Sequence, residues 1–305
     1  MMRFLVTALL VLTALIAPSH ASDTITRELK FEIGGVARRA ILVNASTDQS
    51  LRPAVIVLHG GKGSAEMQRR RTGFDAIAVA EGFSVVYAEG TRWGRGFHAW
   101  NTGYLQRQQV GRSDDIGYFD RLIDLLVREH RVDPARVYMT GGSNGGMMTF
   151  VYAVNRPGRL AAIAPVVGAM FTFEKQPAVP VPILMINGAQ DNEVPIEGGM
   201  SRNPQVRRAQ LAPYKSLQST VDFWISANRS LQTGNTVSEG TVRTTTYPAP
   251  EGGAVTISIV DSVGGHGWPG TRPDRTENTP IKAFDGAERV WAFFRTQRRT
   301  ESAPP

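Results

Sequence analysis

The segment 137–148 places a serine between a buried strand and a helix. An apolar run that ends at Thr140 predicts a short strand, and the apolar residues after Ser143 recur at helical spacing. Gly141 and Gly145 flank this serine in the pattern G-x-S-x-G, and glycine permits the sharp turn that such a corner needs. The turn would expose the hydroxyl above the sheet, and the amino-terminal end of the helix would face developing negative charge. The segment therefore predicts a nucleophile elbow in an α/β fold.

The first 21 residues differ in character from the rest of the chain. Arg3 precedes the apolar stretch Phe4–Ala17, and Ser19–His20–Ala21 has the form of a small-x-small cleavage site. A membrane anchor is the alternative, but about 14 apolar-leaning residues are few for a membrane span. We therefore expect a signal peptide at residues 1–21, export to the periplasm or the extracellular space, and no stable membrane insertion. Residues 22–305 are then expected to form a single domain.

Composition restricts the class of protein further. The 305 residues are 42% hydrophobic and 20% charged, which is the balance of a folded globular protein. The sequence contains no cysteine, so we expect its core to hold it together without disulfides. The formal net charge is +7 and is spread over scattered arginines. This distribution predicts no nucleic-acid partner, and the spacing of His and Asp residues predicts neither a metal site nor a cofactor.

Apolar runs and amphipathic segments alternate along the rest of the chain. The runs predict strands at 38–43, 53–58, 83–88, 159–167, 181–187, 241–247 and 254–260. Helical spacing predicts helices at 73–81, 116–129, 216–228 and 285–295. Short continuous apolar strands separated by helices are typical of a mostly parallel sheet that is covered on both faces. We therefore predict an α/β fold with a central sheet and helices on both faces.

Two downstream residues complete a candidate triad with Ser143. Asp191 lies on the loop directly after the strand 181–187, and we prefer it to Glu193 because it is nearer the strand end. A calcium-binding or turn-forming role for this acidic loop is the alternative. His266 follows the last strand and is flanked by glycines, the position of a general base. The order serine, aspartate, histidine is that of the α/β-hydrolase fold.

A glycine-rich loop follows the strand 53–58. The backbone N–H of Gly60 or Gly61, together with that of Asn144, is predicted to bind an oxyanion. An ordinary turn at a strand end is the alternative. We interpret His59 as a residue that shapes this loop and borders the substrate, rather than as a base.

Aromatic residues gather near the predicted site. Trp268 stands two residues after His266, and Trp100 belongs to an aromatic-rich segment, residues 89–111, that we expect to form a loop over the site. We predict that both tryptophans contact substrate, although packing over the sheet edge is a common use of such side chains.

Together these motifs resemble the esterase/polyhydroxybutyrate depolymerase family, which is akin to feruloyl and acetylxylan esterases. The segments that carry the resemblance are Leu58–His59–Gly60, Trp100–Asn101, Asp114–Tyr118, Gly141–Met148, Asp191 with Val194–Pro195, Gly264–Gly270, and Asp285 with Val290–Phe294. The resemblance implies a secreted serine esterase in which Ser143, Asp191 and His266 match the family's triad. Many relatives carry a cysteine where this chain has Gly61, and that departure removes an expected disulfide.

The predicted reaction is hydrolysis of an ester substrate. The family resemblance favours hydroxyalkanoate oligomers, with feruloyl or acetyl esters of plant polysaccharide as the alternative. A secreted serine peptidase and a non-enzymatic binding protein on the same scaffold are further alternatives. The sequence predicts nothing about oligomeric state.

Overall fold

The computed structural model describes residues 25–44, 50–94, 96–104, 112–171, 175–270 and 281–299. The predicted signal peptide, residues 1–21, lies outside these ranges. In the described chain no helix combines the length and the apolar character that crossing a membrane requires.

Ten strands of the described residues form one sheet, in the order β1-β2-β4-β3-β7-β8-β9-β12-β11-β10. These strands are β1 (Ile25–Ile33), β2 (Val36–Asn44), β3 (Arg52–Leu58), β4 (Ser84–Ala88), β7 (Val132–Gly142), β8 (Ala162–Val166), β9 (Ile183–Gly188), β10 (Asn235–Glu239), β11 (Val242–Tyr247) and β12 (Thr256–Asp261). A separate hairpin pairs β5 (Thr91–Trp93) with β6 (Phe97–Ala99). The helices are α1 (Ala65–Thr72), α2 (Phe74–Glu81), α3 (Asp115–Glu129), α4 (Asn144–Asn155), α5 (Pro204–Ala209), α6 (Leu217–Asn228) and α7 (Gly286–Phe294), with a 3₁₀ turn at Pro157–Arg159.

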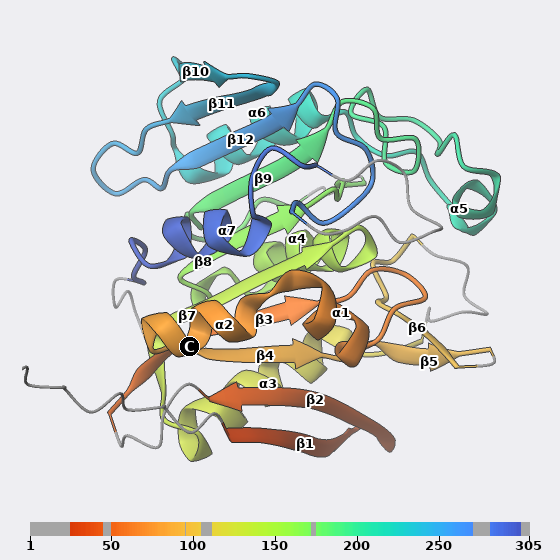
Figure 1. Cartoon of the computed structure of the whole chain (residues 1–305), viewed down its shortest axis with the longest axis vertical. Helices are drawn as coiled ribbons and strands as arrows, with labels where there is room; N and C mark the ends of the chain where they lie inside the picture. The colour runs from red at the N-terminus through yellow and green to blue at the C-terminus, as the bar shows by residue number, and fades with distance from the viewer. Residues whose placement is uncertain are drawn as a thin grey trace, which may run out of the picture.

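The centre of the sheet is parallel. Strands β4, β3, β7, β8, β9 and β12 pair in parallel in that order. Strands β2 and β1 extend one edge in antiparallel pairing, and β11 and β10 extend the other (Figure 1). The carboxyl ends of the parallel strands therefore meet along one edge, on the right in Figure 1, where ligands bind in open α/β sheets.

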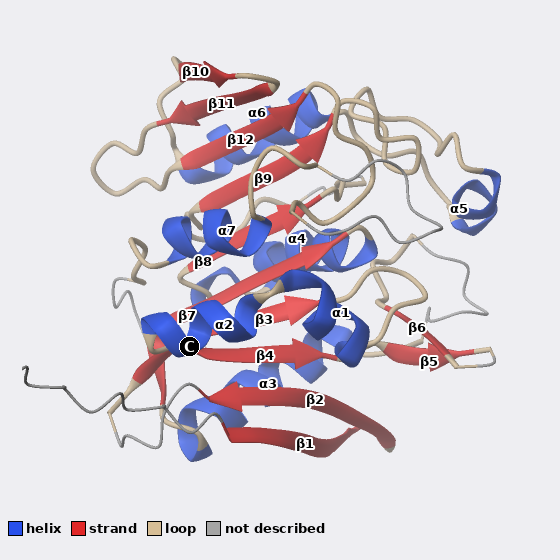
Figure 2. Cartoon of the chain, viewed as in Figure 1, coloured by secondary structure: helices blue, strands red, loops and turns tan. Residues whose placement is uncertain are grey.

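Helices cover both faces of the sheet, as the sequence predicts (Figure 2). Side chains of α3, α4 and α6 share one hydrophobic cluster with the strands. Side chains of α1, α2 and α7 share a second cluster on the opposite face. The α/β-hydrolase fold class predicted from the sequence is therefore confirmed.

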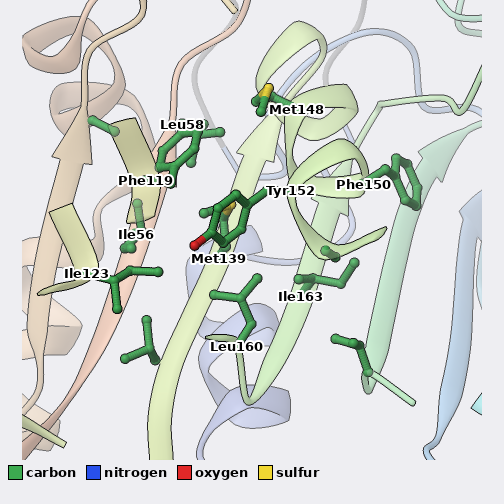
Figure 3. Packing of buried hydrophobic residues seen from close by; sticks show 14 of the residues in the cluster. Ile56, Leu58, Phe119, Ile123, Met139, Met148, Phe150, Tyr152, Leu160 and Ile163 are labelled. Atoms are coloured by element: carbon green, nitrogen blue, oxygen red, sulfur yellow. The ribbon is translucent and has the colours of Figure 1, made fainter. Parts of the chain in front are cut away.

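Strand alternation divides the core between these two faces. Ile56 and Leu58 of β3 belong to the cluster under α3 and α4 (Figure 3). Val55 and Val57 belong to the cluster on the opposite face. All four side chains are fully buried, and burying each contributes about 1.5–3 kcal/mol relative to exposure. This packing on both faces fixes the end of β3, and with it the start of the glycine-rich loop.

Several elements differ from the prediction. Helix α1 has the sequence AEMQRRRT, which has no apolar stripe, and its first turn is capped by Ser64 Oγ, which accepts from Met67 N at 3.2 Å. Strand β10 is exposed along its whole length and had no apolar run to reveal it. The segment 89–111, predicted as a loop, contains the β5–β6 hairpin. Each of these elements depends on capping or pairing rather than on hydrophobic periodicity.

The two acidic residues at the start of α3 have different roles. Asp114 caps the helix, because its Oδ1 accepts from Gly117 N at 2.8 Å. Asp115 instead forms a buried ion pair with Arg38, with 2.7 Å between Nη2 and Oδ1. Asp114 therefore stabilises the start of the helix, whereas Asp115 holds the buried Arg38. At the other end of α3, burial and the nearby charge of Arg27 lower the pKa of His130, so an imidazolium is disfavoured there.

Candidate active site

Ser143 lies at the turn between β7 and α4. Its backbone has φ 55° and ψ −121°, a conformation that L-residues rarely adopt. Ser143 N donates to Val166 O at 2.9 Å, and Ser143 O accepts from Met147 N at 2.9 Å. Both bonds hold the strained residue in place, because a strained backbone conformation persists only where the surrounding structure determines it.

The flanking glycines are required by close backbone contacts. A Cβ on Gly141 would lie 2.7 Å from the carbonyl carbon of Gly145. A Cβ on Gly145 would lie 2.6 Å from His59 O and 2.7 Å from Leu58 O. The serine turn, the first turn of α4 and the end of β3 therefore touch directly, so both glycines of the G-x-S-x-G pattern are needed because a side chain would not fit these contacts.

His266 and Asp191 form a hydrogen-bonded pair. The distance between His266 Nδ1 and Asp191 Oδ2 is 2.8 Å, and Asp191 is 1% exposed. The other carboxylate oxygen, Oδ1, accepts from the backbone N–H of Glu193 and of Val194, each at 2.8 Å. A carboxylate held by three donors fixes the ring and favours the tautomer with the proton on Nδ1. Ser143 and His266 both line one pocket.

Glu193 lies on the other side of the imidazole. Its Oε2 is 3.4 Å from His266 Nε2, and its Oε1 accepts from Asn203 Nδ2 at 3.2 Å. The two acids of this loop therefore contact different ring nitrogens, and Asp191 occupies the orienting position at Nδ1. Burial and the charges of Asp191 and Glu193 raise the pKa of the nearby Tyr214. The sequence did not predict the contact between Glu193 and Nε2, because nothing local shows which nitrogen an acid will face.

The glycine-rich loop lies against the serine turn. A Cβ on Gly60 would lie 3.4 Å from Ser143 Cβ, and one on Gly61 would lie 3.8 Å from Asn144 Cβ. The side chain of Asn144 is tied down at both ends, since Oδ1 accepts from Trp100 N at 2.8 Å and Nδ2 donates to Trp100 O at 3.2 Å. The three residues predicted to supply oxyanion donors are thus brought together beside the candidate nucleophile.

His59 shapes this loop from within the protein. Its Nε2 accepts from Gly90 N at 3.0 Å, so its Nδ1 carries the proton and donates to Gly60 O at 2.7 Å. Burial lowers the pKa of His59 to about 4, so the ring is neutral at physiological pH. Although His59 borders the pocket, it is only 1% exposed, which favours its interpretation as a residue that shapes the loop.

Trp100 is not placed where we expected it. Its ring is fully buried, it is absent from the described pocket lining, and its Nε1 donates to His59 O at 2.9 Å. The ring packs against Phe119 at a centroid distance of 5.2 Å. The prediction of a substrate contact is therefore wrong for Trp100, which supports the glycine-rich loop from below. Trp268, in contrast, does line the pocket and packs edge-on against Phe74.

The pocket has a volume of about 750 Å³, a size that suits a small organic ligand. Its walls come from the glycine-rich loop, α1, the β5–β6 hairpin, the serine turn, α5 and the loop of His266. Trp93 of the hairpin also lines the pocket. The sequence predicts only that this residue lies in the loop 89–111. In the described ranges no group of three His, Cys, Asp or Glu side chains is arranged to hold a metal ion.

The parallel sheet, the serine at its strand-to-helix turn and the histidine–aspartate pair at the same edge place the chain in the α/β-hydrolase class. Residues 39–201 match the sequence model of the Esterase PHB depolymerase family. The chain belongs to that family.

Named relatives agree with this assignment. The chain is 32% identical over 232 residues to Putative esterase NocK of Nocardia uniformis subsp. tsuyamanensis, a match that covers 72% of this chain and 66% of that protein. It is 30% identical over 140 residues to the bifunctional acetylxylan esterase/xylanase XynS20E of Neocallimastix patriciarum, covering 46% of this chain and 19% of that protein. It is 32% identical over 122 residues to poly(3-hydroxyalkanoate) depolymerase C of Paucimonas lemoignei, covering 39% and 28%.

The fold has counterparts among solved structures. An acetyl xylan esterase from Aspergillus awamori superposes with a TM-score of 0.59 at 13% identity, covering 88% of this chain and 98% of that one. At this identity the likeness concerns the fold alone. The chain spans less than two thirds of the length of the curated relatives named above.

Proposed function

We propose that this protein is a serine carboxylic-ester hydrolase. The observation that carries the proposal is the 2.8 Å contact between His266 and Asp191 at the pocket that also exposes the strained Ser143. Membership of a family whose named relatives include esterases supports the reaction class. We further propose export by the segment 1–21, whose support is the charged and apolar pattern of the sequence.

In the proposed mechanism Ser143 attacks the ester carbonyl carbon while His266 Nε2 takes the hydroxyl proton. Asp191 holds the proton of Nδ1 and stabilises the imidazolium that forms. The backbone N–H of Asn144 and that of Gly60 or Gly61 bind the developing oxyanion. His266 then donates its proton to the leaving alcohol, and the C–O bond of the ester breaks to give an acyl-enzyme.

Water completes the reaction, and the same groups now act in the reverse direction. His266 removes a proton from water as its oxygen attacks the acyl carbon, and the serine oxygen leaves with that proton. The carboxylic acid is released and Ser143 is restored. The substrate we favour is a hydroxyalkanoate oligoester, with feruloyl or acetyl esters of plant polysaccharide as the alternative; Trp268 and Trp93 offer apolar walls to either.

The test is hydrolysis of p-nitrophenyl butyrate and of a peptide p-nitroanilide by wild type and by Ser143→Ala, His266→Ala and Asp191→Asn. We expect ester hydrolysis alone, with kcat reduced about 10⁴-fold in the first two variants. Ser262→Ala is the matched control, since this serine is exposed and lies four residues before His266. Near-wild-type turnover by folded Ser143→Ala would rule out the proposed nucleophile, and faster anilide cleavage would favour a peptidase.

A further inference from the structure

We propose that the pocket recognises esters that also carry a free carboxylate. The basis is the charge of the pocket wall, to which three cationic side chains contribute, Lys62, Arg71 and Arg208. The inference rests on the proposed esterase function and specifies the class of ester. A short oligomer of hydroxy acids, which ends in a carboxylate, belongs to that class.

The first arginine comes from α1. Met67, Gln68 and Arg71 of this helix line the pocket, and the spacing i, i+1, i+4 places them on one helix face. Arg70, the residue just before Arg71, does not belong to the pocket wall. Helix α1 begins directly after the glycine-rich loop, so its pocket face adjoins the proposed oxyanion donors.

The second arginine comes from α5, across the pocket. Arg208 lines the pocket, together with Gln205, whereas its neighbour Arg207 does not. Lys62 Nζ donates to Gln205 Oε1 at 3.1 Å and so joins the glycine-rich loop to α5, although the two residues are 143 positions apart in sequence. The cations are therefore distributed over three elements that enclose the same space.

The described residues of the pocket wall carry fewer negative than positive side chains. Among the described residues that line the pocket, Glu193 is the one carboxylate, and it is engaged by His266 and Asn203. Asp191 lies behind the imidazole and is buried. The described residues of the wall therefore include three cations and one carboxylate, a balance that favours binding of an anion, and arginine in particular matches the geometry of a carboxylate.

This charge distribution separates the candidate substrates. A terminal carboxyl group of a hydroxy-acid oligomer has an ordinary pKa near 4 and is ionised at neutral pH, whereas an acetyl group on a polysaccharide is neutral. Hydrolysis of the oligomer's ester bond adds water across it and yields a hydroxy acid and a shortened acid. The pocket would therefore hold one anionic group while Ser143 attacks the neighbouring ester.

The experiment compares 3-hydroxybutyrate dimer with its terminal N-methylamide, which has the same internal ester but no charge. The readout is the ratio of kcat/KM for the two substrates, measured by release of 3-hydroxybutyrate at low and high salt. We expect wild type to favour the dimer about tenfold, on the scale of a charge-assisted hydrogen bond, with the preference reduced by salt. The ratio should fall about tenfold in Arg71→Gln/Arg208→Gln, mainly through KM.

Arg70→Gln/Arg207→Gln is the matched control, because it removes two charges from the same helices outside the pocket wall. Equal ratios in the two double variants, or a wild type that hydrolyses both substrates equally well, would overturn the proposal. A failure of the proposed esterase function would give a different result. In that case wild type would cleave neither substrate faster than Ser143→Ala does.

Discussion

Protonation of His59 is expected to destabilise the folded protein. Burial lowers the pKa of this ring to about 4, against 6.5 in the unfolded chain. Between these two pH values the unfolded state binds a proton that the folded state does not, so the free energy of unfolding falls as pH falls. At about 1.4 kcal/mol per pH unit, the loss amounts to about 3 kcal/mol between pH 6.5 and pH 4.

The structural reason for this loss of stability is that a proton on His59 Nε2 would have no hydrogen-bond acceptor. Nε2 accepts from Gly90 N, and a proton on Nε2 would end that bond and leave a buried charge. The assay is urea unfolding followed by tryptophan fluorescence at pH 7, 6, 5 and 4, for wild type and His59→Gln. Glutamine does not titrate, so the stability advantage of wild type should shrink by about 3 kcal/mol over this range.

Glu89 is a second buried group whose protonation lowers stability in acid. Burial alone would raise the pKa of Glu89, but the hydrogen bond from Arg39 lowers it, and the net shift is downward. The stability that this carboxylate contributes is therefore lost as pH falls. Because wild type and variant share this loss, it cancels in the difference between them. A difference that stayed constant from pH 7 to pH 4 would refute the assignment of His59 as a buried neutral ring.

Two substitutions test the packing around the site by thermal unfolding. Gly145→Ala places a methyl group against the backbone oxygens of Leu58 and His59 and should lower the free energy of unfolding by about 1–3 kcal/mol, with loss of ester hydrolysis. The control is Gly158→Ala, which should cost little because nothing lies within 4 Å of the added methyl group. Equal effects of the two substitutions would contradict the close contact at Gly145. Asp115→Asn leaves the buried Arg38 without its charged partner and should lower the free energy of unfolding by about 3–5 kcal/mol. The control Asp114→Asn keeps a helix cap and should cost under about 1 kcal/mol. A larger loss for Asp114→Asn than for Asp115→Asn would show that Asp114 has the larger role.

Local chemistry explains which parts of the site the sequence predicted. The serine turn needs glycine at Gly141 and Gly145, and strand and helix patterns on either side are visible within a dozen residues. Asp191 and His266 were found because strand ends of a parallel sheet gather at one edge, so position after a strand predicts nearness in space.

Tertiary contacts explain what the sequence missed. Trp100 was expected in the pocket because aromatic residues on a loop often face ligands, but the loop turns its ring into the core. Arg71 and Arg208 carry no motif, and only the folding of α1 and α5 around the pocket places them on the wall of the pocket that Ser143 also lines. Charged residues of this kind are common on surfaces, so their pattern alone predicts no site.

The central claim is that Ser143 is the nucleophile, and covalent labelling tests it most directly. The protein is incubated with diisopropyl fluorophosphate, the loss of p-nitrophenyl butyrate hydrolysis is followed, and the adduct is located by peptide mass mapping. We predict one phosphoryl adduct per chain, at Ser143, with activity lost in proportion to labelling and no adduct in Ser143→Ala. Complete inactivation with the adduct on another residue, or persistent hydrolysis by fully labelled protein, would contradict the account.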